Sequence, residues 1–234
     1  MRFATLLVVL VFGLTLTSCH TMPPPLARDV PAPANILSLA KKQGLVPIAA
    51  YDPTLRVDQR YATSDNVFKR VLYPPGFPAL LADPTARKLA KANQLLKRHG
   101  LRTLVLDAYR PPEVQWQLYQ LYRDDKFVAD PRKKWSKHCY GRAVDVTLTA
   151  LADATHTPLT LPSEFDDFSR KAAATYVGKD PRVRRRLALL QQAMTAAGFS
   201  LYADEWWHFN DLSDASALAG RPIFGREIGL RVGG

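Results

Sequence analysis

The sequence predicts an α+β fold built as a single domain, in which helices flank a mixed or antiparallel sheet. Two observations predict it. Stretches with the apolar spacing of half-buried helices alternate irregularly with short apolar stretches typical of strands. The chain also has 234 residues, of which 47% are hydrophobic, and this is enough to bury one large core.

Helices are predicted over 83–100, 111–121 and 180–198 from their start and stop signals. The first and the last open with the dipeptide Asp-Pro, in which an N-cap residue precedes a proline at the first helical position. Both end at a glycine, and apolar residues recur at helical spacing between these two signals. The middle helix begins at a pair of prolines.

Strands are predicted over 101–107, 142–148 and 199–209. The first has a continuous apolar centre, and the second alternates between apolar and polar residues. The third is rich in aromatic residues, and its simplest interpretation is one strand that follows directly from the last helix. Residues 48–61 have a mixed pattern that indicates short strands and turns.

The first residues resemble a bacterial lipoprotein signal. An apolar run over 3–16 is followed by Leu16-Thr17-Ser18-Cys19, which predicts removal of residues 1–18 and lipid attachment to the thiol of Cys19. Residues 19–40, with their prolines in the first part, predict a tether, and 41–234 the folded domain. A secretory signal with an incidental cysteine or an uncleaved anchor also fits. The expected location is a membrane-anchored lipoprotein in the periplasm or cell envelope.

The formal net charge of +11 predicts attraction to polyanions. For an exported protein, acidic wall polymers or anionic lipid headgroups fit better than nucleic acid, which we do not expect as a partner. Solvated helix faces without any partner explain the charge equally well. With the thiol of Cys19 carrying lipid, Cys139 would be the only free thiol, so no internal disulfide is possible and we expect this residue to pack in the interior.

Three residues form a candidate zinc site. His138 and Asp145 lie seven positions apart across Gly141, and His208 comes much later in a structured, aromatic stretch. Two imidazoles and one carboxylate are a ligand set of open zinc sites, which leave one position for water or substrate. Taken alone, each histidine is more simply interpreted as a hydrogen-bonded core or surface residue.

Glu205 and Arg110 could complete a hydrolytic site. Glu205 stands beside two tryptophans, where an unpaired carboxylate is costly, and a zinc-bound water next to it would explain its presence. Arg110 follows the end of a predicted strand, from which a guanidinium could stabilise a developing oxyanion. The alternatives are a salt-bridged structural acid for Glu205, and an arginine that caps carbonyls or pairs with Asp107.

Two motifs resemble the signatures of the zinc D-Ala-D-Ala peptidases. This group also contains D,D-carboxypeptidases and proteins with the hedgehog-like fold. The two motifs are Ser136-x-His138-x-x-Gly141-x-Ala143-x-Asp145 and Glu205-x-Trp207-His208. Further stretches are similar to the VanX-type D-alanyl-D-alanine dipeptidases: Tyr61-Ala62-Thr63-x-Asp65-Asn66, Asp107-x-Tyr109-Arg110-Pro111, Asp145-Val146-Thr147-Leu148, Phe165-Asp166 and the doubled tryptophan 206–207. The similarity extends over about residues 45–212 and implies a hedgehog-like, D,D-peptidase-like fold.

The resemblance implies one zinc ion per chain, bound by His138, Asp145 and His208. It also implies that Glu205 is the general base and acid when a zinc-bound water attacks D-alanyl-D-alanine, and that Arg110 steadies the transition state. The products would be two molecules of D-alanine.

The resemblance further implies a small pocket in which Asp166, Ser136 and Tyr61 recognise the substrate, with Asp166 facing the free ammonium. Two other functions stay open: a D,D-carboxypeptidase that trims peptidoglycan stem peptides, and a non-catalytic, lipid-anchored wall-binding protein. The sequence does not indicate an oligomeric state. An exported enzyme fits scavenging or wall turnover better than removal of the dipeptide before wall synthesis.

Overall fold

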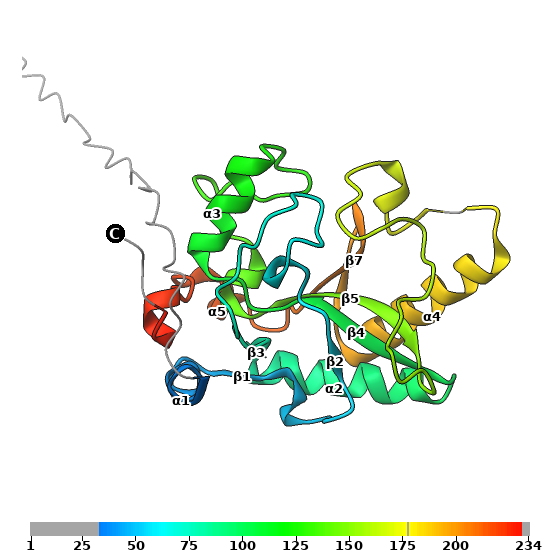
Figure 1. Cartoon of the computed structure of the whole chain (residues 1–234), viewed down its shortest axis with the longest axis horizontal. Helices are drawn as coiled ribbons and strands as arrows, with labels where there is room; N and C mark the ends of the chain where they lie inside the picture. The colour runs from blue at the N-terminus through cyan, green and yellow to red at the C-terminus, as the bar shows by residue number, and fades with distance from the viewer. Residues whose placement is uncertain (1–32, 177, 231–234) are drawn as a thin grey trace, which may run out of the picture.

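The protein is described by a computed structural model that covers residues 33–176 and 178–230. Figure 1 shows one central sheet, with helices beneath it and loops and shorter helices above. The sheet has five strands in the order β2-β4-β5-β7-β6. Their bounds are Arg56–Val57 (β2), Leu101–Asp107 (β4), Ala143–Ala150 (β5), Glu205–Asn210 (β7) and Ser200–Tyr202 (β6).

The sheet is mixed. The short β2 pairs in parallel with β4, whereas the β4–β5, β5–β7 and β7–β6 pairs are antiparallel. A separate antiparallel pair is formed by β1 (Leu45–Pro47) and β3 (Leu80–Ala82). The predicted α+β fold with a mixed sheet flanked by helices is therefore confirmed.

Two long helices cover one face of the sheet. They are α2 (Asp83–Lys97) and α4 (Pro181–Ala197), and Figure 1 shows both beneath the strands. Leu89 and Leu96 of α2 and Leu190 of α4 are buried together with Val144 and Val146 of β5 in one apolar cluster. Burial of such side chains contributes about 2 kcal/mol each, so this layer supplies much of the stability of the fold.

The opposite side carries shorter elements and a second cluster that is rich in aromatic rings. Helix α3 (Pro112–Leu121) contributes Val114 and Leu118, which pack in the same cluster as Tyr61 and Tyr73. The remaining helices are α1 (Pro33–Lys42), α5 (Ala215–Ala219) and the 3-10 helices η1 (Ile48–Ala50), η2 (Arg60–Ala62), η3 (Lys137–Tyr140), η4 (Arg170–Ala172) and η5 (Gly225–Ile228). Side chains of β5 and β7 that face this side are available for a functional site.

Three predictions of local structure are wrong. Helix α1 occupies part of the predicted 19–40 tether, because Ile36 and Ala40 are buried in the second cluster and hold this stretch against the domain. The predicted strand 199–209 is a hairpin, β6 and β7, with a turn between Tyr202 and Glu205. Asp83 lies inside the first turn of α2 instead of capping it, and its carboxylate pairs with Arg87.

The predicted signal over 1–18 and the lipidation site at Cys19 lie outside the described residues. Within 33–176 and 178–230, no helix has the length and apolar character that a membrane crossing requires. Cys139 is fully buried and unpaired, as expected for a packing cysteine.

Candidate metal centre

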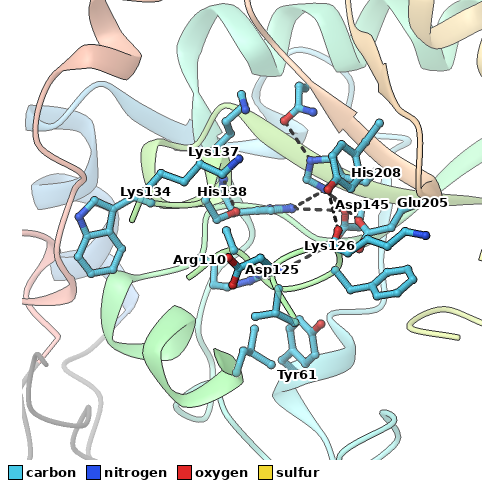
Figure 2. Close-up of a pocket in the computed structure, with 18 residues that line it drawn as sticks. Tyr61, Arg110, Asp125, Lys126, Lys134, Lys137, His138, Asp145, Glu205 and His208 are labelled. Atoms are coloured by element: carbon cyan, nitrogen blue, oxygen red, sulfur yellow. Dashed lines mark hydrogen bonds and ion pairs between the residues drawn. The ribbon is translucent and has the colours of Figure 1, made fainter. Parts of the chain in front are cut away.

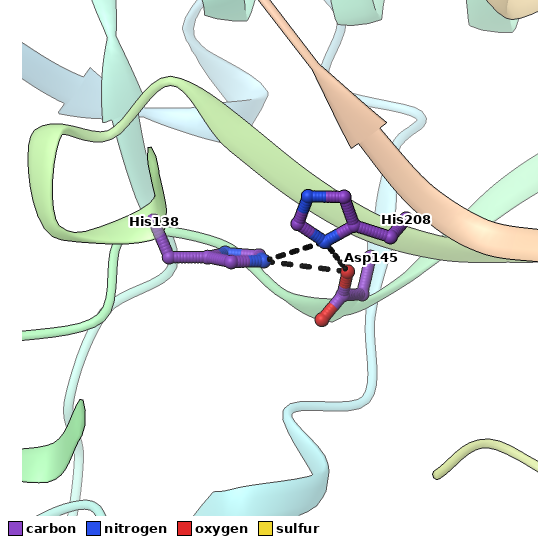
Figure 3. A group of neighbouring side chains, drawn as sticks. All are labelled: His138, Asp145 and His208. Carbon is purple, nitrogen blue, oxygen red and sulfur yellow. Dashed lines mark hydrogen bonds and ion pairs between the residues drawn. The ribbon is translucent and has the colours of Figure 1, made fainter. Parts of the chain in front are cut away.

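The predicted ligands His138, Asp145 and His208 meet above the centre of the sheet (Figure 3). Asp145 on β5 and His208 on β7 are direct neighbours in the antiparallel register, so their side chains stand on the same face. His138 comes from η3, which immediately precedes β5. Two adjacent strands and one short helix therefore bring together residues that are far apart in the sequence.

The three ligand atoms are close enough to share one cation. His208 Nδ1 lies 2.9 Å from Asp145 Oδ1, and His138 Nε2 lies 3.3 Å from the same oxygen. The two ring nitrogens are 3.2 Å apart. Their set of two nitrogens and one carboxylate oxygen matches the ligands of open zinc sites, so these residues fit a metal ion.

Neighbouring groups fix the orientation of both imidazoles. His138 Nδ1 is 2.6 Å from the carbonyl oxygen of Ala108, and His208 Nε2 is 3.0 Å from Oδ1 of Asn210. A proton on each of these outer nitrogens donates to an oxygen and leaves the inner nitrogen with its lone pair directed at the centre. Such outer partners set the tautomer of metal-binding histidines and raise their basicity.

Gly141 allows η3 to sit close to the rest of the domain. Its φ of +64° is a left-handed conformation, and an added Cβ would lie 2.7 Å from the backbone nitrogen of Ala82. The amide of Ala82 donates to the Gly141 carbonyl at 2.9 Å, and the amide of Arg110 donates to the His138 carbonyl at 3.2 Å. These contacts hold His138 against the ends of β3 and β4.

The carboxylate of Asp145 is held in its charged form. Burial alone raises its pKa, but the two adjacent imidazoles outweigh this effect and hold the pKa well below its usual range. Burial lowers the pKa of His208. A charged carboxylate beside a neutral imidazole is the protonation state that metal binding requires.

Glu205 faces the same pocket because the hairpin is irregular. Residues three apart on a regular strand point to opposite faces, but the β6–β7 register shifts between Leu201 and Tyr202, and Glu205 Oε2 lies 3.7 Å from His208 Nδ1. The side chain of Glu205 forms no ion pair with a lysine or arginine of the described chain. Glu205 is therefore not the salt-bridged structural acid that the sequence left as an alternative.

The environment of Glu205 favours its neutral form in the absence of a cation. Only 6% of the residue is exposed, and burial raises its pKa well above the usual range, with the nearby Asp145 and Asp166 acting in the same direction. The charge of a bound metal ion would oppose this rise. Perturbed acids of this kind gather at catalytic sites.

Arg110 pairs with Asp107 and also lines the pocket. Its Nη2 lies 2.6 Å from Asp107 Oδ2 and 3.7 Å from Asp145 Oδ2, and its Nη1 donates to Oε1 of Gln115 at 2.8 Å. The pairing that sequence analysis kept as an alternative is thus present. The ion pair fixes the guanidinium beside the metal-binding group. Arg110 therefore both pairs with Asp107 and lines the candidate site.

The three predicted recognition residues differ in how they reach the pocket. Tyr61 and Ser136 line it, and the hydroxyl of Ser136 also accepts from the amide of His138 at 3.4 Å as the N-cap of η3. Asp166 lines a neighbouring cavity and accepts a hydrogen bond from the Tyr61 hydroxyl at 2.9 Å. Burial raises the pKa of Asp166 to about 8.

The pocket over the metal-binding group has a cavity volume of about 90 Å³ (Figure 2). Sequence analysis did not single out several of its lining residues, among them Lys126, Lys134, Lys137, Tyr202 and Asn210. Asn210 could have been found, because it lies two positions after His208 on the same strand and so on the same face. Lys126 and Lys134 could not, because loops bring them to the pocket, whereas Lys137 belongs to η3 and directly precedes His138.

Comparisons of the sequence with a family model and with two known proteins point to the same family. The sequence profile of the D-ala-D-ala dipeptidase family matches residues 41–224. A D-alanyl-D-alanine dipeptidase of Escherichia coli (strain K12) is 32% identical over 165 residues, which cover 70% of this chain and 83% of the relative. A protein of the same name from Enterococcus faecium is 28% identical over 176 residues, covering 66% of this chain and 85% of the relative. The chain thus belongs to the D-Ala-D-Ala dipeptidase family of metallopeptidases.

Proposed function

We propose that the protein is a zinc-dependent dipeptidase that hydrolyses D-alanyl-D-alanine to two molecules of D-alanine. The observation that carries the proposal is the position of Glu205, 3.7 Å from His208, beside a group of ligands that fits one metal ion. The names of both relatives give the same substrate. The small volume of the pocket also favours a small peptide.

His138, Asp145 and His208 would hold the zinc ion. When bound, zinc would polarise the scissile carbonyl and lower the pKa of water. Glu205 would accept the proton of the attacking water and then deliver it to the leaving amine. The absence of a cationic partner for Glu205 in the described chain leaves its carboxylate free for this transfer.

Arg110 and Tyr61 would position the substrate. The guanidinium of Arg110, fixed by Asp107 and Gln115 and 3.7 Å from Asp145, would stabilise the negative charge that develops on the attacked carbonyl. Tyr61 lines the pocket and its hydroxyl donates to Asp166, so this pair would meet the ammonium of a free dipeptide. Ser136 lines the pocket next to His138.

The proposal is tested by adding D-alanyl-D-alanine and its N-acetylated form to the zinc-loaded protein in parallel. A dipeptidase releases D-alanine from the free dipeptide and much less from the capped one, because the cap removes the ammonium. Equal or faster turnover of N-capped stem peptides would identify a D,D-carboxypeptidase. Release from neither substrate, with zinc bound, would reject both enzymes and favour a wall-binding protein.

We further propose that the chain is exported and anchored through lipid on Cys19. The support is the order of the N-terminal residues: an apolar run followed by Leu16-Thr17-Ser18-Cys19. Labelled fatty acid should be incorporated into the parental protein and not into a Cys19→Ala variant. Equal labelling of the two proteins, or no labelling of the parent, would contradict the anchor.

A further inference from the structure

The charges at the rim of the catalytic pocket are unevenly paired. Among its lining residues, Lys126 forms an ion pair with Asp204 at 3.0 Å, and Asp125 pairs with Lys133, which does not line the pocket. Lys134 and Lys137 also line the pocket, yet neither forms an ion pair with an acid in the described chain. Two positive charges therefore remain uncompensated at the entrance.

These two lysines act as a pair. Lys134 and Lys137 are three positions apart in the chain and line the same pocket, so their ammonium groups lie at one end of it (Figure 2). Lys137 is half-buried on η3 and Lys134 is exposed on the preceding loop. A site that keeps like charges together gains stability when an anion binds between them.

The pair lies at the opposite end of the pocket from Tyr61. Figure 2 shows Lys134 and Lys137 on one side of His138 and Tyr61 on the other, with Arg110 between them. Tyr61 is bonded to the buried carboxylate of Asp166. The pocket thus has two uncompensated ammonium groups at one end and the Tyr61–Asp166 hydrogen bond at the other, so a ligand with an acid at one terminus and an amine at the other fits it.

We propose that Lys134 and Lys137 form the subsite that binds the free terminal carboxylate of the substrate. This inference rests on the proposed function, because it takes a dipeptide with both termini free as the ligand. The ammonium would lie towards Tyr61 and the carboxylate towards the two lysines, which places the peptide bond over the metal-binding group. The lysines are specificity-determining residues that select peptides ending in a free acid.

Binding without turnover tests the subsite. The zinc-loaded Glu205→Gln protein is titrated with D-alanyl-D-alanine and with its C-terminal amide, and the two dissociation constants are compared by calorimetry. The free acid should bind about 10- to 100-fold more tightly than the amide, the effect of one charge-assisted contact. Adding Lys134→Met and Lys137→Met should weaken binding of the acid by that factor and leave the amide unchanged, since methionine keeps most of each apolar stem.

A matched control removes the same charge elsewhere. Lys91 and Lys179 are exposed and do not line the pocket, so Lys91→Met with Lys179→Met should leave both dissociation constants at their starting values. Zinc content confirms that each variant keeps its metal site.

The subsite is rejected if the Lys134/Lys137 variant keeps the preference for the acid, if the acid and the amide weaken equally, or if the acid does not bind to the starting protein. D-alanine release by the parental enzyme is measured separately. A failure of the proposed hydrolysis is therefore distinguishable from a failure of the subsite.

Discussion

The Oδ1 atom of Asn210 lies 3.0 Å from Nε2 of His208, the ring nitrogen that points away from the metal-binding group. Both residues belong to β7 and stand on the same face, and the cross-strand partner of His208 is Asp145. Asn210 therefore fixes the tautomer that presents Nδ1 of His208 to a cation.

Replacing Asn210 should weaken zinc binding. Asn210→Leu keeps the approximate volume and removes the acceptor, so zinc affinity should fall about 10- to 100-fold in a chelator competition. Asn210→Asp keeps an acceptor and should retain affinity near the parental value. Parental zinc affinity in the leucine variant would show that Asn210 does not orient His208.

His208→Ala should abolish metal binding together with activity, because one of three ligands is lost and the two that remain rarely hold zinc. Metal analysis after gel filtration measures zinc per chain. His99→Ala is the matched control, since this histidine is exposed at the end of α2 and should leave zinc content unchanged. One zinc per chain in the His208→Ala variant would remove His208 from the site.

Arg110→Ala should destabilise the fold as well as reduce activity. Asp107 is fully buried and would keep the Tyr73 hydroxyl as a hydrogen-bond donor but lose its cation, at a cost of about 3 kcal/mol in the free energy of unfolding. Arg110→Lys keeps the charge and should recover most of this stability but little activity, because lysine lacks the planar fork. Unfolding in urea measures the first effect, and an unchanged midpoint for Arg110→Ala would contradict it.

Asp166→Asn should stabilise the metal-free protein and impair the enzyme. Burial raises the pKa of Asp166 from 3.8 to about 8, so folding takes up a proton between these values and the free energy of unfolding falls as pH rises through this window. The asparagine variant carries no such penalty and should be more stable by about 4 kcal/mol at pH 7, with no difference below pH 3.8.

Asparagine is the appropriate replacement because Asp166 has a φ of +59°, a left-handed conformation that asparagine also adopts. Urea unfolding of both proteins at several pH values in chelator measures the difference. A constant difference between pH 3 and pH 8 would exclude titration of Asp166 as its cause. Undiminished activity of the variant would exclude Asp166 from substrate recognition.

Much of the fold follows from local signals. Helix α4 begins and ends where an Asp-Pro start and a glycine predict, because Asp180 accepts from the amide of Arg182 and Gly198 adopts a φ of +101°. Helix α1 was missed since prolines dominate the surrounding composition, whereas burial of Ile36 and Ala40 decides its structure. Propensity gives way to tertiary packing in such segments.

The candidate site likewise has residues that the sequence points to and residues that it does not. Ligand types and the resemblance to the family motifs single out His138, Asp145 and His208 as candidates, but they cannot reveal the irregular hairpin that turns Glu205 towards them. Nor does the sequence predict that Lys126 and Lys133 form ion pairs with aspartates, whereas Lys134 and Lys137 form none in the described chain. These features depend on loop conformations that no local pattern specifies.

The role of Glu205 beside a bound zinc ion is tested most directly by comparing D-alanine release by the zinc-loaded parental protein and by Glu205→Gln, with zinc content measured on the same samples. We expect one zinc per chain in both proteins and a rate at least about 1,000-fold lower in the variant, because the group that carries the proton is lost while the metal stays. Parental activity in the zinc-loaded variant, or no D-alanine from the zinc-loaded parent, would contradict this role.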